Sequence, residues 1–188
     1  GLVGSEMCIR DRHIPESPRY GEAMLRPDDD TGELALGVVL VVGGGKVACS
    51  LARALTLAGL DVALGSRHPV PLPRASQPWR VVAWEDVSRT AADLVVVAVS
   101  DDAIPGVASR LDPRIPAVHC SGASSPDALS PIATRGVWHP LMAFPTRTTP
   151  VAPSTVFGVC AGEPLACRLV ALTRQLGYIA ETHEARAL

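Results

Sequence analysis

The sequence predicts an α/β fold with a doubly wound, mostly parallel sheet and helices on both faces. Strand-sized apolar runs alternate with segments whose apolar residues recur at helical spacing, as in βαβ units. Several of these runs are uniformly apolar, which is typical of parallel strands covered on both faces. Three consecutive glycines, Gly43 to Gly45, separate the first apolar run from the first helical segment.

Eight strands are expected from the apolar runs. The clearest are LGVVLVV and DLVVVAV, which are continuous and rich in β-branched residues. Strands are predicted over 36–42, 61–64, 80–84, 93–99 and 117–120, from 137 onward, and over 155–160 and 178–181.

Four helices are expected between these strands. The first begins after the glycines and ends at Gly59, a residue that often terminates a helix. Its apolar positions at helical spacing are Val47, Leu51, Ala54, Leu55 and Ala58. Helices are predicted over 46–58, 102–111, 125–134 and 163–176.

Composition excludes several classes of function. The 188 residues are 47% hydrophobic and 19% charged, which indicates one folded domain with a filled core. A net charge of −2 and only 4% aromatic residues argue against nucleic-acid binding. No apolar run reaches the roughly 18–20 residues that span a bilayer. Five cysteines without a signal peptide or metal-ligand spacing indicate reduced thiols, no metal site and a cytoplasmic protein.

The two ends of the chain differ from its middle. Residues 1–34 are expected to be a disordered lead-in, and the first twelve, GLVGSEMCIRDR, resemble a translated sequencing adapter rather than a natural N-terminus. The dinucleotide-binding domain is expected over 35–182. Residues 183–188 begin a helical pattern without a stop signal, so we expect a fragment whose helical domain is missing.

The glycine run matches the G-x-G-x-x-A pattern between a predicted strand and a predicted helix. In that context the first glycine permits a tight turn, and the second lets a diphosphate approach the backbone. The alanine lets the helix pack closely on the strand. The alternative is a glycine-rich turn without a ligand. The predicted dinucleotide-binding residues of this Rossmann-like loop are Gly43, Gly44, Gly45, Lys46, Val47 and Ala48.

The end of the second strand indicates which dinucleotide binds. NAD-binding domains carry a carboxylate about 20 residues after the glycines, but here the sequence has Ser66 and Arg67. A hydroxyl and a planar guanidinium suit the 2′-phosphate of NADP. The sequence therefore favours NADP over NAD, although a solvent-facing Arg67 is the alternative.

Ligands of doubly wound sheets lie at the carboxyl ends of the strands. After the fourth strand, the predicted cofactor contacts are Val99, Ser100 and Asp101, whereas Asp102 is expected to cap the following helix.

Four segments occur in the order VVGGGKVACSLARAL, DLVVVAVSDDAI, VHCSGA and GVWHPLMAFP. Together they resemble a family of bacterial Rossmann-like oxidoreductases, in which the nucleotide domain precedes a helical domain of unknown function. That family is similar to pyrroline-carboxylate reductases, deazaflavin-dependent NADP reductases and β-hydroxyacid dehydrogenases. The resemblance covers about 36–188. It implies a helical domain that closes the active site, a homodimer through that domain, and Ile104 as an apolar wall near the nicotinamide.

Candidate substrate residues follow the fifth and sixth strands. Ser121 and Gly122 lie at the expected crevice, and the resemblance implies that a Ser-Gly pair binds substrate; the alternative for Ser121 is a helix cap. His139 is a candidate proton donor because imidazole titrates near neutrality. It could instead bind a substrate acid group or orient the loop before Pro140. Arg147 is expected to be a solvated loop residue rather than an anion ligand.

These features predict the NADP-binding domain of an oxidoreductase. Hydride would pass between the nicotinamide and a small carbonyl, imine or hydroxy compound, which is the expected small-molecule partner. Ser121 and His139 are the candidate catalytic residues. The alternative is a non-catalytic dinucleotide-binding or sensor module. If the helical domain is missing, this chain should bind cofactor without turnover, because its site would be open to water.

Overall fold

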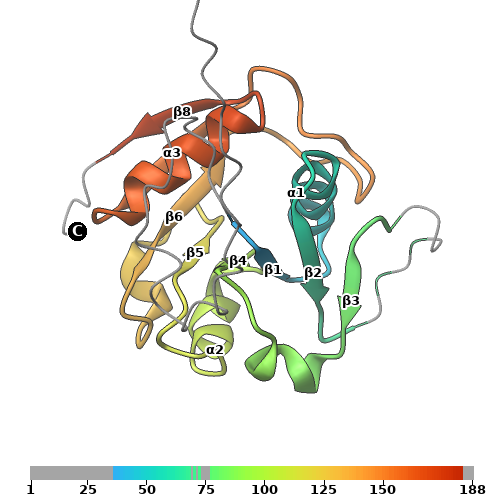
Figure 1. Cartoon of the computed structure of the whole chain (residues 1–188), viewed down its shortest axis with the longest axis vertical. Helices are drawn as coiled ribbons and strands as arrows, with labels where there is room; N and C mark the ends of the chain where they lie inside the picture. The colour runs from blue at the N-terminus through green and yellow to red at the C-terminus, as the bar shows by residue number, and fades with distance from the viewer. Residues whose placement is uncertain (1–35, 69, 71, 73–76, 184–188) are drawn as a thin grey trace, which may run out of the picture.

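The structure is a computed structural model of the chain and describes residues 36–68, 70, 72 and 77–183 (Figure 1). The predicted lead-in over 1–34 and the helical pattern over 184–188 lie outside the described residues. No helix in the described part of the chain has the length and apolar content needed to cross a membrane.

Eight strands form one sheet in the order β3-β2-β1-β4-β5-β6-β7-β8. Neighbouring strands are parallel except β6 and β7, which are antiparallel. The first six strands therefore have the order of the Rossmann fold, and the predicted fold class is confirmed. The strands are β1 (Val38–Val42), β2 (Asp61–Gly65), β3 (Arg80–Val82), β4 (Leu94–Val97), β5 (Ala117–His119), β6 (Arg135–Pro140), β7 (Val156–Ala161) and β8 (Ile179–Thr182).

Helices cover both faces of the sheet, as Figure 1 shows. The α-helices are α1 (Lys46–Leu57), α2 (Ile104–Ala108) and α3 (Leu165–Gln175), and the 3₁₀ helices are η3 (Trp84–Arg89), η4 (Asp101–Ala103) and η5 (Pro126–Leu129). Alternate side chains of β1 point to opposite faces. Val39 and Val41 pack beneath α1 and α3, whereas Leu40 and Val42 pack against α2, η3 and η5.

Two predicted helices are wrong in extent. The segment predicted as a helix over 125–134 contains only η5, because Pro131 lacks the N–H group that a continuous helix requires. The helix predicted over 102–111 is divided into η4 and the short α2. Pro105 lies in the first turn of α2, where a missing N–H is tolerated.

Strand differences are smaller. The third strand ends at Val82 rather than 84, and Trp84 begins η3, an element that the sequence analysis did not include. The antiparallel direction of β7 follows from the connection over 141–155. That segment contains no helix, whereas a return to a parallel strand usually needs one.

The fold brings the carboxyl ends of several strands to one edge of the sheet. Val42 of β1 pairs with Val97 of β4, which in turn pairs with His119 of β5. The glycine loop, the loop after β4 and the loop after β5 therefore follow neighbouring strands at the same edge, where ligands bind in open α/β sheets.

Candidate functional site

The glycine loop has a backbone that only glycine suits at its first position. Gly43 has φ +142°, and a side chain there would collide with the carbonyl of Ala98. The Gly43 N–H donates to the carbonyl of Gly65 at 2.8 Å, which ties the loop to the end of β2. These contacts explain the tight turn predicted at Gly43.

The next two glycines face different surroundings. A Cβ at Gly44 would come too close to the Ser66 side chain, just after β2, so that hydroxyl would have to turn away. A Cβ at Gly45 would meet no atom of the described residues within 4 Å. The protein itself does not require a glycine at position 45, and this backbone is left open to a ligand.

The N-terminus of α1 is suited to an anion. Its first helical hydrogen bond runs from the Cys49 N–H to the Gly45 carbonyl at 3.1 Å, so the N–H groups of Lys46, Val47 and Ala48 precede the helical ladder. No side chain caps this end, and no acidic residue lies in the first turn. Free N–H groups and the positive end of the helix dipole attract phosphates.

A cavity of about 550 Å³ opens beside the loop. Ser66 and Arg67 line it at the end of β2, and Arg67 is exposed. It contains no acidic side chain in its lining. The lining residues are Gly43, Gly44, Ser66, Arg67, His68, Trp84, Val99, Ser100, Ala103, Gly106, Val107 and Arg110.

Two residues of this cavity were not identified from the sequence. The guanidinium carbon of Arg110 lies 5.1 Å from the centre of the Trp84 ring, in the range of a cation–π contact. Trp84 comes from η3 and Arg110 follows α2. No local pattern links positions separated in this way, so only the fold brings them together.

The loop after β4 differs in part from expectation. Val99 and Ser100 line the cavity, while Asp101 is exposed in η4. Asp102 does not cap a helix: Ser100 holds the N-terminal position of η4, and no side chain makes the capping bond. Ile104 is the first residue of α2, is 1% exposed and packs in the core, which leaves little surface for the ring-facing wall that the resemblance implied.

His119 is held as a neutral imidazole at the end of β5. Its Nδ1 accepts the Ser121 N–H at 3.2 Å, so Nε2 carries the proton and donates to the Ser125 carbonyl at 3.0 Å. Burial lowers the pKa of His119 below its usual range, and the opposing effects of Ser125 and Asp101 are smaller. The sequence-based interpretation of a buried, hydrogen-bonded histidine therefore fits.

Ser121 is engaged within its own turn. Its Oγ accepts the N–H groups of Ala123 and Ser124, each at 3.1 Å, and lies 3.2 Å from the Ser124 hydroxyl. These bonds hold the hydroxyl within its own turn; they do not cap a helix, because Ser125 has the N-terminal cap position of η5. Gly122 is exposed beside this turn.

His139 lies across from this turn, at the end of β6. Its Nδ1 lies 2.6 Å from the carbonyl of Cys120, and because a carbonyl only accepts, Nδ1 carries the proton. Nε2 is the remaining nitrogen, and it occupies the space that a side chain at Gly122 would need. The structure thus brings Ser121, Gly122 and His139 together.

Arg147 is exposed, as expected for a loop residue, but it is not merely solvated. Its Nε donates to the carbonyl of Gly44 at 2.8 Å, across 103 residues of sequence. The loop after β6 therefore contacts the glycine loop directly.

Cys49 and Cys120 supply no nucleophile at this edge. Burial raises the pKa of Cys120 to about 12 and also raises the pKa of Cys49, so both thiols stay protonated at neutral pH. No cluster of three or more metal-ligating side chains occurs within the described ranges.

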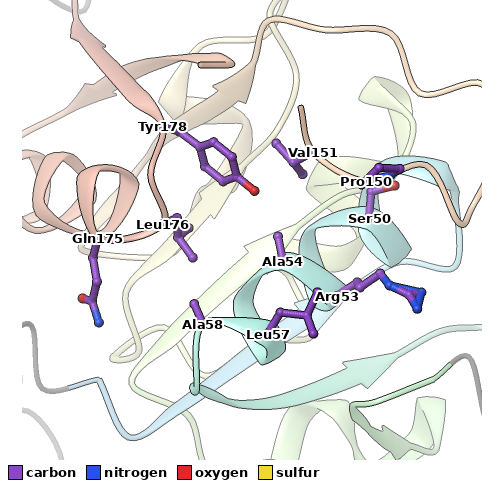
Figure 2. A pocket seen from close by; sticks show the side chains of 10 residues that line it. All are labelled: Ser50, Arg53, Ala54, Leu57, Ala58, Pro150, Val151, Gln175, Leu176 and Tyr178. Carbon is purple, nitrogen blue, oxygen red and sulfur yellow. The ribbon is translucent and has the colours of Figure 1, made fainter. Parts of the chain in front are cut away.

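A second cavity, of about 340 Å³, lies between α1 and α3 (Figure 2). Tyr178 points its hydroxyl into this space, whereas the polar ends of Arg53 and Gln175 point to different sides of it. The Ser50 hydroxyl is buried without a hydrogen-bond partner in the described part of the chain. Because the polar groups do not converge, this cavity is a weaker candidate than the glycine loop.

The strand order and the glycine loop define a Rossmann-type α/β domain. Solved structures share this fold. A Bacteroides fragilis protein described as a "putative NADP oxidoreductase" matches with a TM-score of 0.65 and 20% identity over 79% of this chain and 61% of that one. Arogenate dehydrogenase of Synechocystis matches with a TM-score of 0.62 and 18% identity, over 79% of this chain and 60% of that one. Prephenate dehydrogenase of A. aeolicus was solved with hydroxyphenyl propionate and NAD+. It matches with a TM-score of 0.65 and 14% identity, over 81% of this chain and 61% of that one.

At these identities the likeness shows the fold. This chain spans 60–61% of the length of those three structures. No family model and no curated protein matches the sequence. Membership of the oxidoreductase family that the motifs resemble therefore stays a prediction.

Proposed function

We propose that this chain is the NADP-binding domain of an oxidoreductase. The observation that carries the proposal is the open backbone at Gly45, next to the uncapped N-terminus of α1. Together they offer free N–H groups to a diphosphate, at the strand edge where dinucleotides bind. The NADP oxidoreductase and the dehydrogenases among the structural neighbours support the same class of function.

The cavity beside the loop favours NADP over NAD. Ser66 and Arg67 would bind the 2′-phosphate, and Arg110 adds a second guanidinium to the same cavity. Trp84 offers an aromatic face to the adenine. No carboxylate in this lining would accept the ribose hydroxyls of NAD. Val99 and Ser100 would contact the ribose from the end of β4, with Asp101 at the rim.

The bound nicotinamide would supply the hydride. The substrate would be a small carbonyl, imine or hydroxy compound, placed near Gly122 and His139. With Nδ1–H fixed on the Cys120 carbonyl, Nε2 is the atom of His139 that can hold or release a proton toward the substrate. Ser121 would contribute mainly by fixing the turn that carries Gly122. The homodimer implied by the sequence resemblance stays a prediction.

A non-catalytic dinucleotide-binding module is the second candidate. The engagement of the Ser121 hydroxyl within its own turn favours it, because that hydroxyl is not free to bind substrate. Substrate-dependent oxidation of NADPH by the chain, screened with small carbonyl and imine compounds, would exclude this alternative.

The test of NADP binding is a titration of NADPH and NADH, monitored by nicotinamide fluorescence. We expect tighter binding of NADPH. The Arg67→Ala variant should bind NADPH about tenfold more weakly or worse, because it loses a charged hydrogen-bonding partner. Its affinity for NADH should stay nearly unchanged. Tighter binding of NADH by the unaltered chain would contradict the preference for NADP. Binding of neither would contradict the proposed function.

A further inference from the structure

Arg147 occupies a defined position at the glycine loop. It lies in the connection over 141–155 between β6 and β7, in a turn fixed by threonine hydroxyls. The Thr146 N–H donates to the Thr149 hydroxyl at 3.0 Å, and the two hydroxyls lie 2.9 Å apart. From this turn, the Arg147 Nε reaches the Gly44 carbonyl at 2.8 Å. One edge of the guanidinium is thereby anchored.

The described residues leave the rest of the guanidinium unused. Among them no acidic side chain pairs with Arg147, and none accepts a hydrogen bond from its terminal nitrogens. A guanidinium has five N–H donors, so the Gly44 contact leaves four of them available.

The anchored guanidinium lies next to the free N–H groups of α1. Gly44 is two residues before Lys46, and consecutive Cα atoms are about 3.8 Å apart. The positive charge of Arg147 also acts on the first turn of the helix, where it partly offsets the rise that burial causes in the pKa of Cys49. An anion held by the N–H groups of this turn is therefore within reach of the Arg147 fork.

We propose that Arg147 is a ligand of the cofactor diphosphate, and that the loop after β6 thereby completes the anion site of the glycine loop. The inference rests on the proposed dinucleotide function and adds a residue that the G-x-G-x-x-A pattern does not contain. Its chemical target is a diphosphate rather than the 2′-phosphate, because Arg147 does not line the cavity that contains Ser66 and Arg67, and its anchor Gly44 lies two residues before the helix N-terminus. Two planar N–H donors suit phosphate oxygens.

The experiment compares ligands with and without the diphosphate in calorimetric titrations of the whole chain. ADP-ribose carries the diphosphate and lacks the 2′-phosphate, whereas adenosine 2′-monophosphate carries only the 2′-phosphate. Arg147→Met should weaken the binding of ADP-ribose, NADPH and NADH about tenfold each. It should change the affinity for adenosine 2′-monophosphate less than twofold. Arg147→Lys, which keeps the charge without the fork, should recover part of the loss. Arg174→Met, at an exposed arginine on α3, is the matched control and should change none of them.

The outcomes separate the two proposals. In one contrary outcome, Arg147→Met loses affinity equally for ligands with the diphosphate and for adenosine 2′-monophosphate, and its thermal midpoint is lower. That result would show that Arg147 only positions the loop and would overturn its role as a ligand. Unchanged ADP-ribose binding in Arg147→Met would overturn it as well. Binding of none of these nucleotides by the unaltered chain would instead overturn the proposed function, and the role of Arg147 with it.

Discussion

The imidazole of His139 lies over Gly122, with its Nδ1 2.6 Å from the carbonyl of Cys120. The ring occupies the space that any side chain at Gly122 would enter. A strand residue and a loop glycine are thus matched in shape, and the hydrogen bond determines which nitrogen of the ring carries the proton.

Gly122→Ala should displace the His139 ring, because the new methyl group would overlap it. The hydrogen bond to Cys120 would then weaken, and the imidazole would populate both neutral tautomers. Nitrogen NMR of the histidine side chains measures this: in the unaltered chain the His139 ring should show a single tautomer with the proton on Nδ1. An unchanged spectrum in the variant would contradict the packing of His139 against Gly122.

His119 should make stability depend on pH. Burial lowers its pKa in the folded chain below the 6.5 of the unfolded chain, so the unfolded state binds the proton more readily. The contribution of neutral His119 to the free energy of unfolding is therefore fully present above pH 6.5. It is lost as the pH falls through the lower pKa of the folded state. Denaturant unfolding at several pH values should show a smaller decline over this window in His119→Gln. An equal decline in both proteins would contradict the assignment.

Gly43→Ala should destabilise the fold by about 1–3 kcal/mol, since it forces an alanine into a strained backbone conformation and against the Ala98 carbonyl. Gly59→Ala is the matched control. Gly59 also has positive φ, at +89°, but a side chain there would meet open space. Chemical unfolding should show a larger loss in the free energy of unfolding for Gly43→Ala than for Gly59→Ala. Similar losses in the two variants would mean that the collision is relieved by movement of the loop.

Trp84 should report the occupancy of the cavity. Trp79 and Trp138 are 6% and 0% exposed, so ligand contact should act mainly on Trp84. Titration with ADP-ribose, which lacks the nicotinamide, should quench tryptophan fluorescence in the unaltered chain. Calorimetry should still detect binding to Trp84→Phe, whose fluorescence should stay nearly constant. Full quenching in that variant would place the adenine away from η3.

The parts of the fold that depend on local pattern could be predicted from the sequence. Uniformly apolar runs identified the buried strands, and the glycine run after the first of them identified the tight turn at Gly43. Helix lengths were predicted less well where prolines intervene: Pro131 ends the pattern that suggested a helix to 134, and the structure has only η5 there.

Contacts between distant segments could not be predicted. Arg147 and Gly44 are 103 residues apart, and nothing in the local sequence of either one indicates the other. The same holds for Trp84 and Arg110, which meet only because η3 and α2 lie on the same face of the sheet. Ser121 shows the opposite problem. Its position at the strand end suggested a ligand contact, but the hydroxyl is held by the N–H groups of its own turn.

The most direct test of dinucleotide binding at the glycine loop is the affinity of Gly45→Asp for NADPH. Gly45 is the N-terminal cap of α1 with φ −80°, and a Cβ there meets no atom of the part of the chain that the structure describes, so aspartate should fit and cap the helix. Its carboxylate would occupy the diphosphate position and repel the phosphates. The account predicts a thermal midpoint equal to or above that of the unaltered chain and a loss of NADPH affinity of about 100-fold or more. Gly162→Asp, at another open glycine, should bind normally. Unchanged NADPH binding by a stable Gly45→Asp variant would contradict the account.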